Sequence, residues 1–349
     1  MDLVLEGFDA YVFDRVYSTL LPAQNASFTG QLDRGNSSTV SSCLESYNFK
    51  PASQFLSFPP SEHACMSSLP RDNIWRQLAS LYIITWLFGT GVYFLCATFS
   101  YIFIFDKSTF AHPKFLANQV RQEIAQAVRA IPWIALLTTP IFALEVRGYG
   151  KLYDASAAGP GRWYDAAQFP LFLCFTDACI YWIHRALHHP LLYRRLHKPH
   201  HRWIMPSPFA SVAFHPLDGF AQSLPYHVFP FLFPLQKFAY VALFAFVQVW
   251  TVVIHDGEYV AANPVVNGAA CHTMHHLYFN WNYGQFTTLW DRLGGSYRRP
   301  DDALFRRELR LSKEEWARQS RKMEEIVREV EGEDERDYAA PAAEAKKVQ

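Results

Sequence analysis

The chain has 349 residues, half of them hydrophobic and 16% aromatic, and its formal net charge is zero. Zero net charge leaves no global basic field to attract nucleic acid, so we expect no nucleic-acid partner. The six cysteines show no CxxC spacing, which argues against a cysteine-based zinc site. The aromatic content fits a membrane interface, and the length fits one large domain with tails.

Residues 1–74 are polar and lack the charged region followed by an apolar stretch that marks a cleaved secretory signal. Entry into a membrane must therefore come from an internal segment. Two N-glycosylation sequons begin at Asn25 and Asn36. We predict that 1–74 is a lumenal N-terminal segment, where glycosylation machinery reaches these sites.

Three apolar stretches predict transmembrane helices. Residues 81–105 are 25 consecutive residues without a charge, above the roughly 20 needed to cross the hydrocarbon core. Residues 130–144 form a shorter uncharged run, which Arg129 can lengthen by snorkelling. Residues 166–183 are interrupted by Asp177, which is costly in lipid unless it faces the protein interior.

Two shorter apolar runs, 224–235 and 238–254, are separated by two polar residues and indicate a helical hairpin. A hairpin returns the chain to the side it left, so histidines before and after it can meet. Basic residues near a span stay on the cytoplasmic side. After the third span these are Arg185, Arg194, Arg195, Lys198 and Arg202, which places this side in the cytosol and the N-terminus in the lumen.

The composition turns polar near Pro300, and Ser312 with Glu315 forms a capping box that predicts a charged helix to about Val330. We expect 301–349 to be a solvated, charged cytoplasmic tail and 75–300 to be a membrane-embedded catalytic domain. The predicted fold class is an all-α integral membrane protein with about three transmembrane helices, a helical hairpin and a cytoplasmic, histidine-rich, metal-binding helical cap.

Histidine is concentrated in one region, because 12 of the 14 histidines lie between His184 and His276. Three groups have spacings of i, i+4 or i, i+3, i+4, which return to one face of a helix. Imidazole nitrogen suits zinc, copper, iron or nickel. The groups are His184 and His188; His197, His200 and His201; and His272, His275 and His276.

These eight histidines exceed what one ion accepts, and with a ninth they suit two metals. His255 ends the second run of the hairpin at the same depth, so we include it as the ninth ligand. His189 can replace His188 if the local helix is distorted, and His215 is a further candidate. His227 is expected to be structural.

Four polar residues are candidates for supporting roles. Asp177 lies two helical turns before His184 on the same face, so it can accept a hydrogen bond from a ligand histidine. The alternative is a buried acid paired with an arginine. Asn282, Tyr283 and Gln285 follow the last group and can contact the ligands or the substrate. Their alternative role is to end the helix and shape a turn.

The ligand number also bears on the metal. A catalytic zinc usually takes three protein ligands and keeps an open position, so eight or nine histidines are too many for it. Two iron ions with open positions can reduce oxygen and so oxidise an unactivated carbon, which lipids offer. The sequence therefore indicates oxygen-dependent oxidation of a lipid at a non-haem iron centre.

The histidine motifs resemble those of the membrane fatty acid hydroxylase and sterol desaturase superfamily. Similarity to the fungal sterol C-5 desaturases lies in HRALHHPLLYRRLHKPHHRW (184–203), PFASVAFHPLDGF (208–220) and CHTMHHLYFNWNYGQFTTLWDRLGGSYRRPDD (271–302). It runs from about the first span to about residue 335 and leaves 1–74 unmatched. Lys346 and Lys347 are similar to a dilysine retrieval signal for the endoplasmic reticulum.

The resemblance implies oxygen-dependent desaturation of a delta-7 sterol at carbons 5 and 6, in ergosterol synthesis, with a cytosol-facing site in the endoplasmic reticulum membrane. The histidines of the three groups would hold two iron ions, and electrons would come from NAD(P)H through cytochrome b5 or its reductase. A hydroxylase or C-4 methyl sterol oxidase on the same scaffold is one alternative. A non-catalytic metal-binding lipid sensor is another.

One basic group has two interpretations. Arg298, Arg299, Arg306 and Arg307 can meet an acidic electron carrier by electrostatic complementarity. They can equally lie at anionic lipid headgroups.

Overall fold

The computed structural model describes residues 1–23, 49–259 and 263–339. These residues are mostly helical, and two short strands, β1 (Leu152–Tyr153) and β2 (Leu235–Gln236), pair in parallel. The predicted helical fold is confirmed, while the side of the membrane that each end faces stays a prediction. The sequons at Asn25 and Asn36 and the lysine pair Lys346 and Lys347 lie outside the described residues.

Three long helices correspond to the predicted spans: α4 (Ile74–Phe103), α5 (Gln119–Val146) and α6 (Arg162–Leu187). The first ends two residues before its predicted end at Phe105, and the other two contain their predicted spans. Each is long and apolar enough to cross a membrane. Hydropathy locates only their apolar centres, and polar turns extend them further. The Asn73 side chain, for example, starts α4 by accepting a hydrogen bond from the backbone N–H of Trp75 at 2.9 Å.

The predicted hairpin is present as α9 (Pro216–Leu232) and α10 (Lys237–Val253), joined by a short turn that contains β2. Each helix has 17 residues, or about 26 Å, slightly less than the hydrocarbon core. Phe229 of α9 and Val247 of α10 belong to one buried cluster with Phe172 and Ile180 of α6. The hairpin is thus packed against the third long helix.

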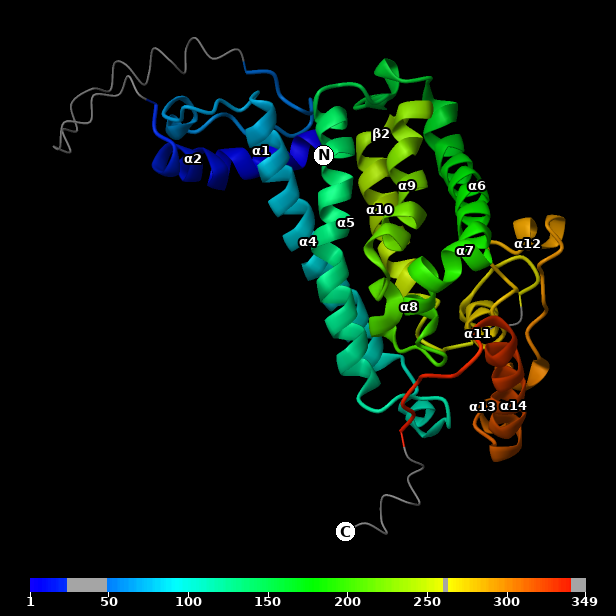
Figure 1. Cartoon of the computed structure of the whole chain (residues 1–349). Coiled ribbons are helices and arrows are strands. Elements are labelled where there is room, and N and C mark those ends of the chain that lie inside the picture. Colours follow the sequence, from blue (N-terminus) through cyan, green and yellow to red (C-terminus); the bar gives the residue numbers. More distant parts are fainter. Residues whose placement is uncertain (24–48, 260–262, 340–349) are drawn as a thin grey trace.

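The N-terminal residues form a helical unit of three consecutive pieces: α1 (Asp2–Phe8), a π-helical turn η1 (Asp9–Phe13) and α2 (Asp14–Leu20). This unit lies across the upper ends of α4 and α5 (Figure 1). Asp14 accepts hydrogen bonds from Arg71 at 2.5 Å and from Arg76 at 2.7 Å, and all three side chains are buried. The polar segment that the sequence left without structure is therefore anchored by ion pairs.

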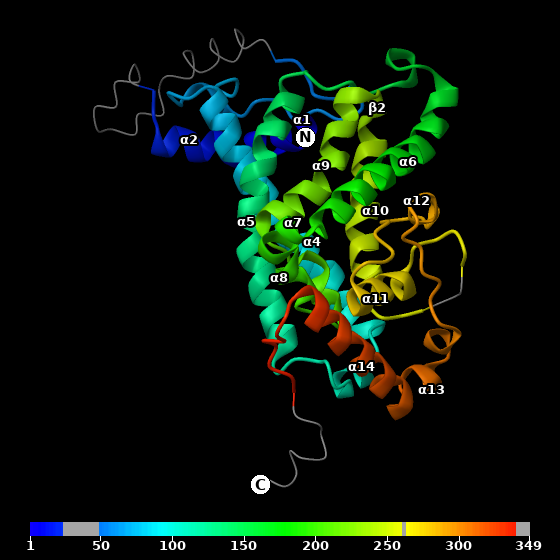
Figure 2. The ribbon, with the colours of Figure 1, turned by 45° about the vertical axis from the view of Figure 1, so that its right-hand side comes forward.

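The histidine-bearing elements gather toward the other end of the long helices, in a cap that lies below α6 and level with the lower parts of α4 and α5 (Figures 1 and 2). Short helices and turns build this cap and the connections: η2 (Glu62–Cys65), η3 (Lys107–Ala111), η4 (Ser156–Ala158), α7 (Pro190–Leu192), η5 (Tyr193–His197), α8 (Lys198–His201), η6 (Pro208–Val212), α11 (Ala269–Tyr278), α12 (Leu289–Leu293), η7 (Asp302–Phe305), α13 (Arg307–Arg310) and α14 (Lys313–Val330).

Helix α14 begins after Ser312, as the capping box predicted, and ends at the predicted Val330. The Ser312 hydroxyl accepts a hydrogen bond from the Glu315 backbone N–H at 3.2 Å. The expectation of a solvated tail, however, does not hold for this helix. Met323 and Val327 are at most 1% exposed and belong to one buried cluster with Met274 of α11. The charged helix therefore covers a histidine-bearing helix, because its apolar side chains recur on one face.

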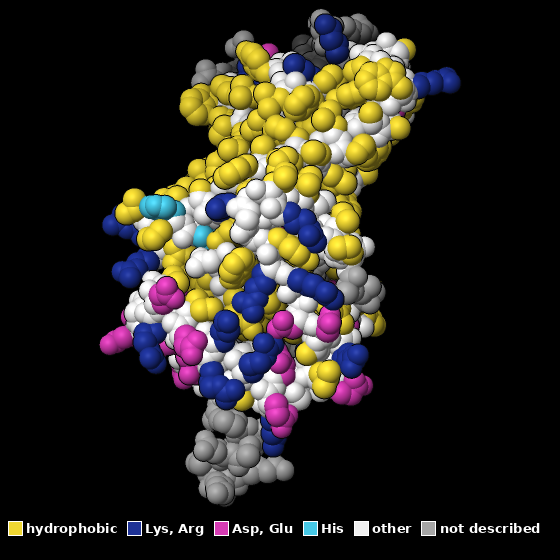
Figure 3. All heavy atoms as spheres, turned by 90° about the vertical axis from the view of Figure 1, so that its right-hand side faces the viewer, with side chains coloured by type: hydrophobic (Ala, Val, Ile, Leu, Met, Phe, Trp, Pro, Cys, Tyr) yellow, Lys and Arg dark blue, Asp and Glu magenta, His cyan; other side chains and the backbone are white. Residues whose placement is uncertain are grey.

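The surface divides along the same axis. One face of the molecule is almost wholly hydrophobic over its upper part and mixes basic and acidic side chains over its lower part (Figure 3). Large apolar side chains such as Leu95 and Phe103 are 71% exposed on α4. A wide apolar band beside a charged cap is the surface expected of a protein embedded in a bilayer.

Candidate metal centre

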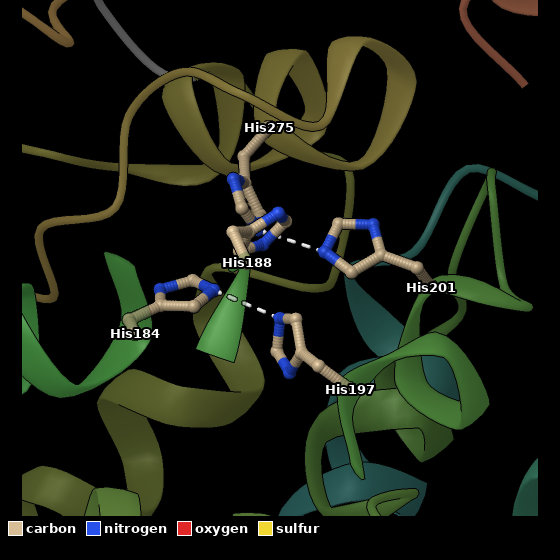
Figure 4. A group of neighbouring side chains, drawn as sticks. All are labelled: His184, His188, His197, His201 and His275. Atoms are coloured by element: carbon tan, nitrogen blue, oxygen red, sulfur yellow. Dashed lines mark hydrogen bonds between the residues drawn. The ribbon is translucent and has the colours of Figure 1, made fainter. Parts of the chain in front are cut away.

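The structure brings all nine histidines of the predicted ligand set together. Within each of two groups, one nitrogen from every histidine lies within 4.8 Å of the others. The first group has five members and is drawn in Figure 4, and the second has four. The first consists of His184, His188, His197, His201 and His275, and the second of His200, His255, His272 and His276.

Local helix geometry explains why two groups form. Neighbouring residues on a helix point about 100° apart. His200 and His201 on α8 therefore enter different groups, and so do His275 and His276 on α11. Each of these His-His pairs joins one helix to both groups, which holds the two prospective sites side by side.

Backbone carbonyl groups fix the orientation of several rings. The Nδ1 atom of His184 lies 3.0 Å from the Tyr283 carbonyl oxygen, and that of His275 lies 2.8 Å from the Trp281 carbonyl oxygen. The Nδ1 of His255 lies 2.7 Å from another carbonyl oxygen, that of Thr251. A carbonyl only accepts, so these Nδ1 atoms carry the proton. The opposite nitrogen, Nε2, is then left with a free lone pair.

His197 has a different partner. Its Nδ1 donates to the carboxylate of Asp218 at 2.8 Å, and both side chains are fully buried. A carboxylate on the far nitrogen of a metal-binding imidazole fixes the ring and raises its basicity. Asp218 was missed by the sequence reasoning, although it lies inside one of the motifs that carried the resemblance. The carbonyl partners of the other rings leave no signal in a sequence.

Within each group, nitrogen lone pairs of different histidines face one another. The Nε2 atoms of His184 and His197 are 3.1 Å apart, one of two such contacts dashed in Figure 4. In the second group, Nε2 of His272 lies 3.0 Å from that of His255. Because His184 and His197 both carry their proton on Nδ1, neither donates across this contact. A cation between the rings removes the repulsion of the lone pairs.

The spacing suits a metal ion as well. Two nitrogens held about 2.1 Å from one ion, at right angles, are about 3.0 Å apart. His188 supplies further support, because its Nε2 is buried and has no hydrogen-bond partner within the described part of the chain. The donor set therefore fits two metal ions, one in each group.

Burial keeps several of these imidazoles neutral. It lowers the pKa of His255 to about 4. A neutral ring retains the lone pair that a metal requires, so no proton has to leave at physiological pH. Burial also lowers the pKa well below the ordinary value for His188, His200, His201, His272, His275 and His276.

Asp177 lies elsewhere than expected. Its carboxylate accepts hydrogen bonds from the backbone N–H groups of Gln285 at 3.0 Å and Phe286 at 2.8 Å, and from the Thr287 hydroxyl at 2.5 Å. None of the partners described for it is a histidine or an arginine. Two helical turns correspond to about 10.5 Å along the axis, which is too far from His184 for contact. Asp177 instead fastens the segment after α11 to α6.

The three polar residues after the last motif have different roles. Tyr283 contacts the site directly, because its ring centroid is 4.9 Å from that of His188 and its carbonyl accepts from His184. Asn282 has a positive φ of 57° and joins the chain at Arg298 through its amide, so it shapes a turn. Within the described ranges, the hydrogen bonds of Gln285 join its backbone N–H to Asp177 and its carbonyl oxygen to Trp250.

The other histidine candidates stay outside both groups. The Nδ1 atoms of His189 and His215 accept backbone N–H bonds at the starts of α7 and α9. His227 is buried with its ring edge-on to Phe142, as expected for a structural histidine.

The chain is similar to known proteins over nearly its whole length. A delta(7)-sterol 5(6)-desaturase of Aspergillus fumigatus is 59% identical over 99% of both chains. A protein of that name from Saccharomyces cerevisiae is 48% identical over 96% of both, and one from Leptosphaeria maculans is 56% identical over all of both. The chain belongs to this fungal sterol desaturase family.

The family match also extends the earlier resemblance. It covers nearly the whole chain, including the first 74 residues that the motifs left unmatched. A profile of the fatty acid hydroxylase family matches residues 169–296, which contain all nine histidines. No solved structure is similar to this chain.

Proposed function

We propose that the chain introduces a double bond between carbons 5 and 6 of a delta-7 sterol in ergosterol synthesis, using oxygen, two histidine-bound iron ions and electrons from NAD(P)H through cytochrome b5 or its reductase. The observation that carries the proposal is the convergence of nine buried imidazoles into groups of five and four, in a chain of the sterol desaturase family. Imidazole is a suitable ligand for iron.

The overall reaction balances as follows. The sterol loses one hydrogen from each of carbons 5 and 6, the carrier supplies two electrons, and two protons come from solvent, so one oxygen molecule becomes two waters. Bound iron supplies the capacity to pass these electrons to oxygen. Under the proposal, the five-membered group holds one ion and the four-membered group holds the other.

The protein contributes orientation and a dry environment. Hydrogen bonds from Nδ1 to carbonyl oxygens turn Nε2 of His184, His255 and His275 toward the group interiors. Asp218 places a negative charge beside His197 at the start of α9. His197 and Asp218 are fully buried, so water does not compete for either end of this contact. These residues hold the ligand geometry before substrate arrives.

We also propose that the protein lies in the endoplasmic reticulum membrane and that its cap faces the cytosol. The basic residues after α6 lie near the cap, where the positive-inside rule retains them. Cys65, in the N-terminal region that lies against the other end of α4, is disulfide-bonded. Disulfides persist in oxidising compartments such as the lumen. Electron donors and NAD(P)H on the cytosolic side then have access to the cap.

Turnover in membranes tests the activity. Native chain supplied with a delta-7 sterol, NADH and oxygen should give a product two mass units lighter, detected by mass spectrometry, and His272→Ala should give none. A product sixteen mass units heavier would instead identify a hydroxylase or methyl oxidase. Sterol binding without any oxygen-dependent product, in iron-loaded protein with a working carrier, would favour a lipid sensor.

A further inference from the structure

The N-terminal unit, made of α1, η1 and α2, carries acids on the side that faces the protein and apolar side chains on the side that faces outward. Glu6, Asp9 and Asp14 are at most 8% exposed. Tyr11 and Leu20, in contrast, are 78% and 71% exposed. A helix on a water-facing surface shows the opposite arrangement, with its charges outward and its apolar side chains in the core. Contact with water therefore does not account for this unit.

The buried acids have their partners in other parts of the chain. Glu6 accepts hydrogen bonds from two backbone N–H groups of segment 50–72, each at 2.6 Å. Asp9 and Asp14 both accept from the guanidinium group of Arg76 at 2.7 Å. Segment 50–72 lies above the unit in both ribbon views, away from the apolar part of the long helices (Figures 1 and 2). The outward face of the unit is thus left without these negative charges.

The exposed positions of the unit form one face. They are 8, 11, 12, 15, 16, 19 and 20, a spacing of three and four residues that returns to the same side of a helix. We call these positions the open face. Its large apolar side chains are Phe8, Tyr11, Val12, Val16 and Leu20, between 39% and 78% exposed. Arg15 is its one charged residue, and the long stem of an arginine lets the guanidinium group reach water from an apolar surface.

The hydroxyl groups at the open face are already hydrogen-bonded. Thr19 and the neighbouring Ser18 both donate to the backbone carbonyl oxygen of Arg15, at 2.8 Å and 2.9 Å. A hydroxyl group in water needs no such partner, whereas an unpaired one in hydrocarbon is costly. These two hydroxyl groups therefore tolerate surroundings from which water is excluded.

The packing of the unit fixes its depth along the spanning helices. Leu5 and Phe13 belong to one buried cluster with Leu81 and Ile84 of α4. Leu81 is the first residue of the uncharged run 81–105, which predicted the first span. The unit therefore lies where the hydrocarbon region begins, and it runs across the long helices instead of along them (Figure 1). This is the placement of an amphipathic helix in a membrane interface.

We propose that the N-terminal unit is an interfacial helix whose open face binds the lipid bilayer, with its apolar side chains among the acyl chains and Arg15 at the lipid phosphates. An apolar face that carries a cation matches acyl chains bordered by phosphate. The competing occupant is a second copy of this chain. Such a contact requires no particular depth, so the position of the unit beside the start of the uncharged run favours lipid. The inference does not rest on the proposed activity.

Photocrosslinking from the open face tests this contact. The photoreactive residue p-benzoylphenylalanine replaces Val12 or Leu20 in the full-length chain, in nanodiscs of phosphatidylcholine with an alkyne on its acyl chains. After irradiation, a dye attached to the alkyne reports lipid adducts on the chain. We expect adducts from both positions, and none from Glu62, whose side chain is 73% exposed in segment 50–72. Thermal unfolding should stay unchanged, because Val12 and Leu20 are exposed.

A change of charge tests the same contact independently. Val12→Asp together with Val16→Asp places two carboxylates on the open face, and the lipid adduct from Leu20 should then fall about tenfold, because lipid disfavours charge. The adduct from Leu87, which is 60% exposed on α4, should not change. The control pair Val12→Leu with Val16→Leu should keep both adducts.

Several results would overturn the proposal. Equal lipid labelling from Glu62 would show that the adducts do not report the open face. Covalent dimers without lipid adducts would assign the face to a second copy of the chain, and crosslinks within one chain would show that the protein itself covers it. Undiminished adducts from Leu20 in the double aspartate variant would show that the apolar side chains do not hold the unit in lipid.

Discussion

Asp218 orients His197, one of the candidate metal ligands, although its own carboxylate belongs to neither histidine group. Its carboxylate accepts the Nδ1 proton of buried His197. Asp218→Asn keeps the shape but removes the charge, so we expect iron affinity to fall about tenfold, the lower end of the usual range for such partners. Competition with a chelator measures this affinity. Asp302→Asn, an exposed cap residue, is the control, and equal affinities would refute this role of Asp218.

The candidate ligands were predictable because a histidine side chain carries its chemistry in its identity. Spacing on helices selected eight of the nine that converge, and the position of His255 at the end of the hairpin added the ninth. Their hydrogen-bond partners were not predictable, since the Tyr283, Thr251 and Trp281 contacts use backbone carbonyl oxygens that every residue has. The predicted hydrogen bond between Asp177 and a ligand histidine was wrong, because residues that share a helix face can still lie far apart along the helix axis.

The helices illustrate a second limit of the sequence. Apolar length predicted the three spans and the hairpin, but it placed the start of the second span at residue 130, whereas α5 begins at Gln119. The first turns of α5, which the apolar pattern did not include, are polar because they pack into the cap. Gln119 donates to the Glu123 carboxylate at 2.7 Å, and Glu123 accepts from the Ser207 backbone N–H at 3.1 Å. Hydropathy reads such residues as the end of a span.

Helix α14 is the element whose role changes most between sequence and structure. Its apolar face was visible in the sequence, but the surface it covers was not, because a helical pattern does not name its partner. Met323 is fully buried in a cluster with Met274, Leu277 and Tyr278 of α11, the helix that carries the last histidine motif. The helix therefore supports the candidate metal centre from outside.

Met323→Ala should accordingly cost about 2–5 kcal/mol of stability, the usual effect of emptying a buried methionine site. It should also reduce the iron retained after dialysis, since α11 loses support. Thermal unfolding and iron analysis of the purified full-length chain give both values. Glu325→Ala, on the exposed side of the same helix, should change neither. Full iron retention in a destabilised Met323→Ala chain would show that α14 stabilises the cap without supporting the site.

We propose that the two ends of the molecule, the N-terminal helices and the histidine cap, lie on opposite sides of the membrane. The N-terminal helices lie at one end of the long helices and the histidine cap at the other (Figure 1). We predict glycosylation at Asn25 or Asn36, seen as a mobility shift that endoglycosidase removes and that the double variant Asn25→Gln, Asn36→Gln lacks. Glycosylation of a sequon engineered into the cap, in place of these two sites, would show that the orientation is the opposite of the one proposed.

The cap also presents basic side chains, which an acidic carrier or anionic lipid headgroups would attract. Arg299 is 71% exposed on its side chain and Arg306 is exposed, whereas Arg298 lies over the Tyr278 ring at 4.1 Å. Reversing Arg299 and Arg306 to Glu should slow reduction by an acidic carrier about tenfold and weaken its salt dependence. Stopped-flow spectroscopy measures the rate. Arg162→Glu, at the other end of the molecule, is the control; unchanged kinetics in the double variant would favour lipid contact.

The proposed function requires that nine histidines hold two iron ions in two groups. Iron per chain, measured by elemental analysis with Mössbauer spectroscopy on protein purified from iron-supplied cells, tests it most directly. We expect two irons in the native chain and in His189→Ala, and about one in His188→Ala and in His255→Ala, which each remove a ligand from one group. Zinc in place of iron, or equal iron in all four proteins, would contradict it.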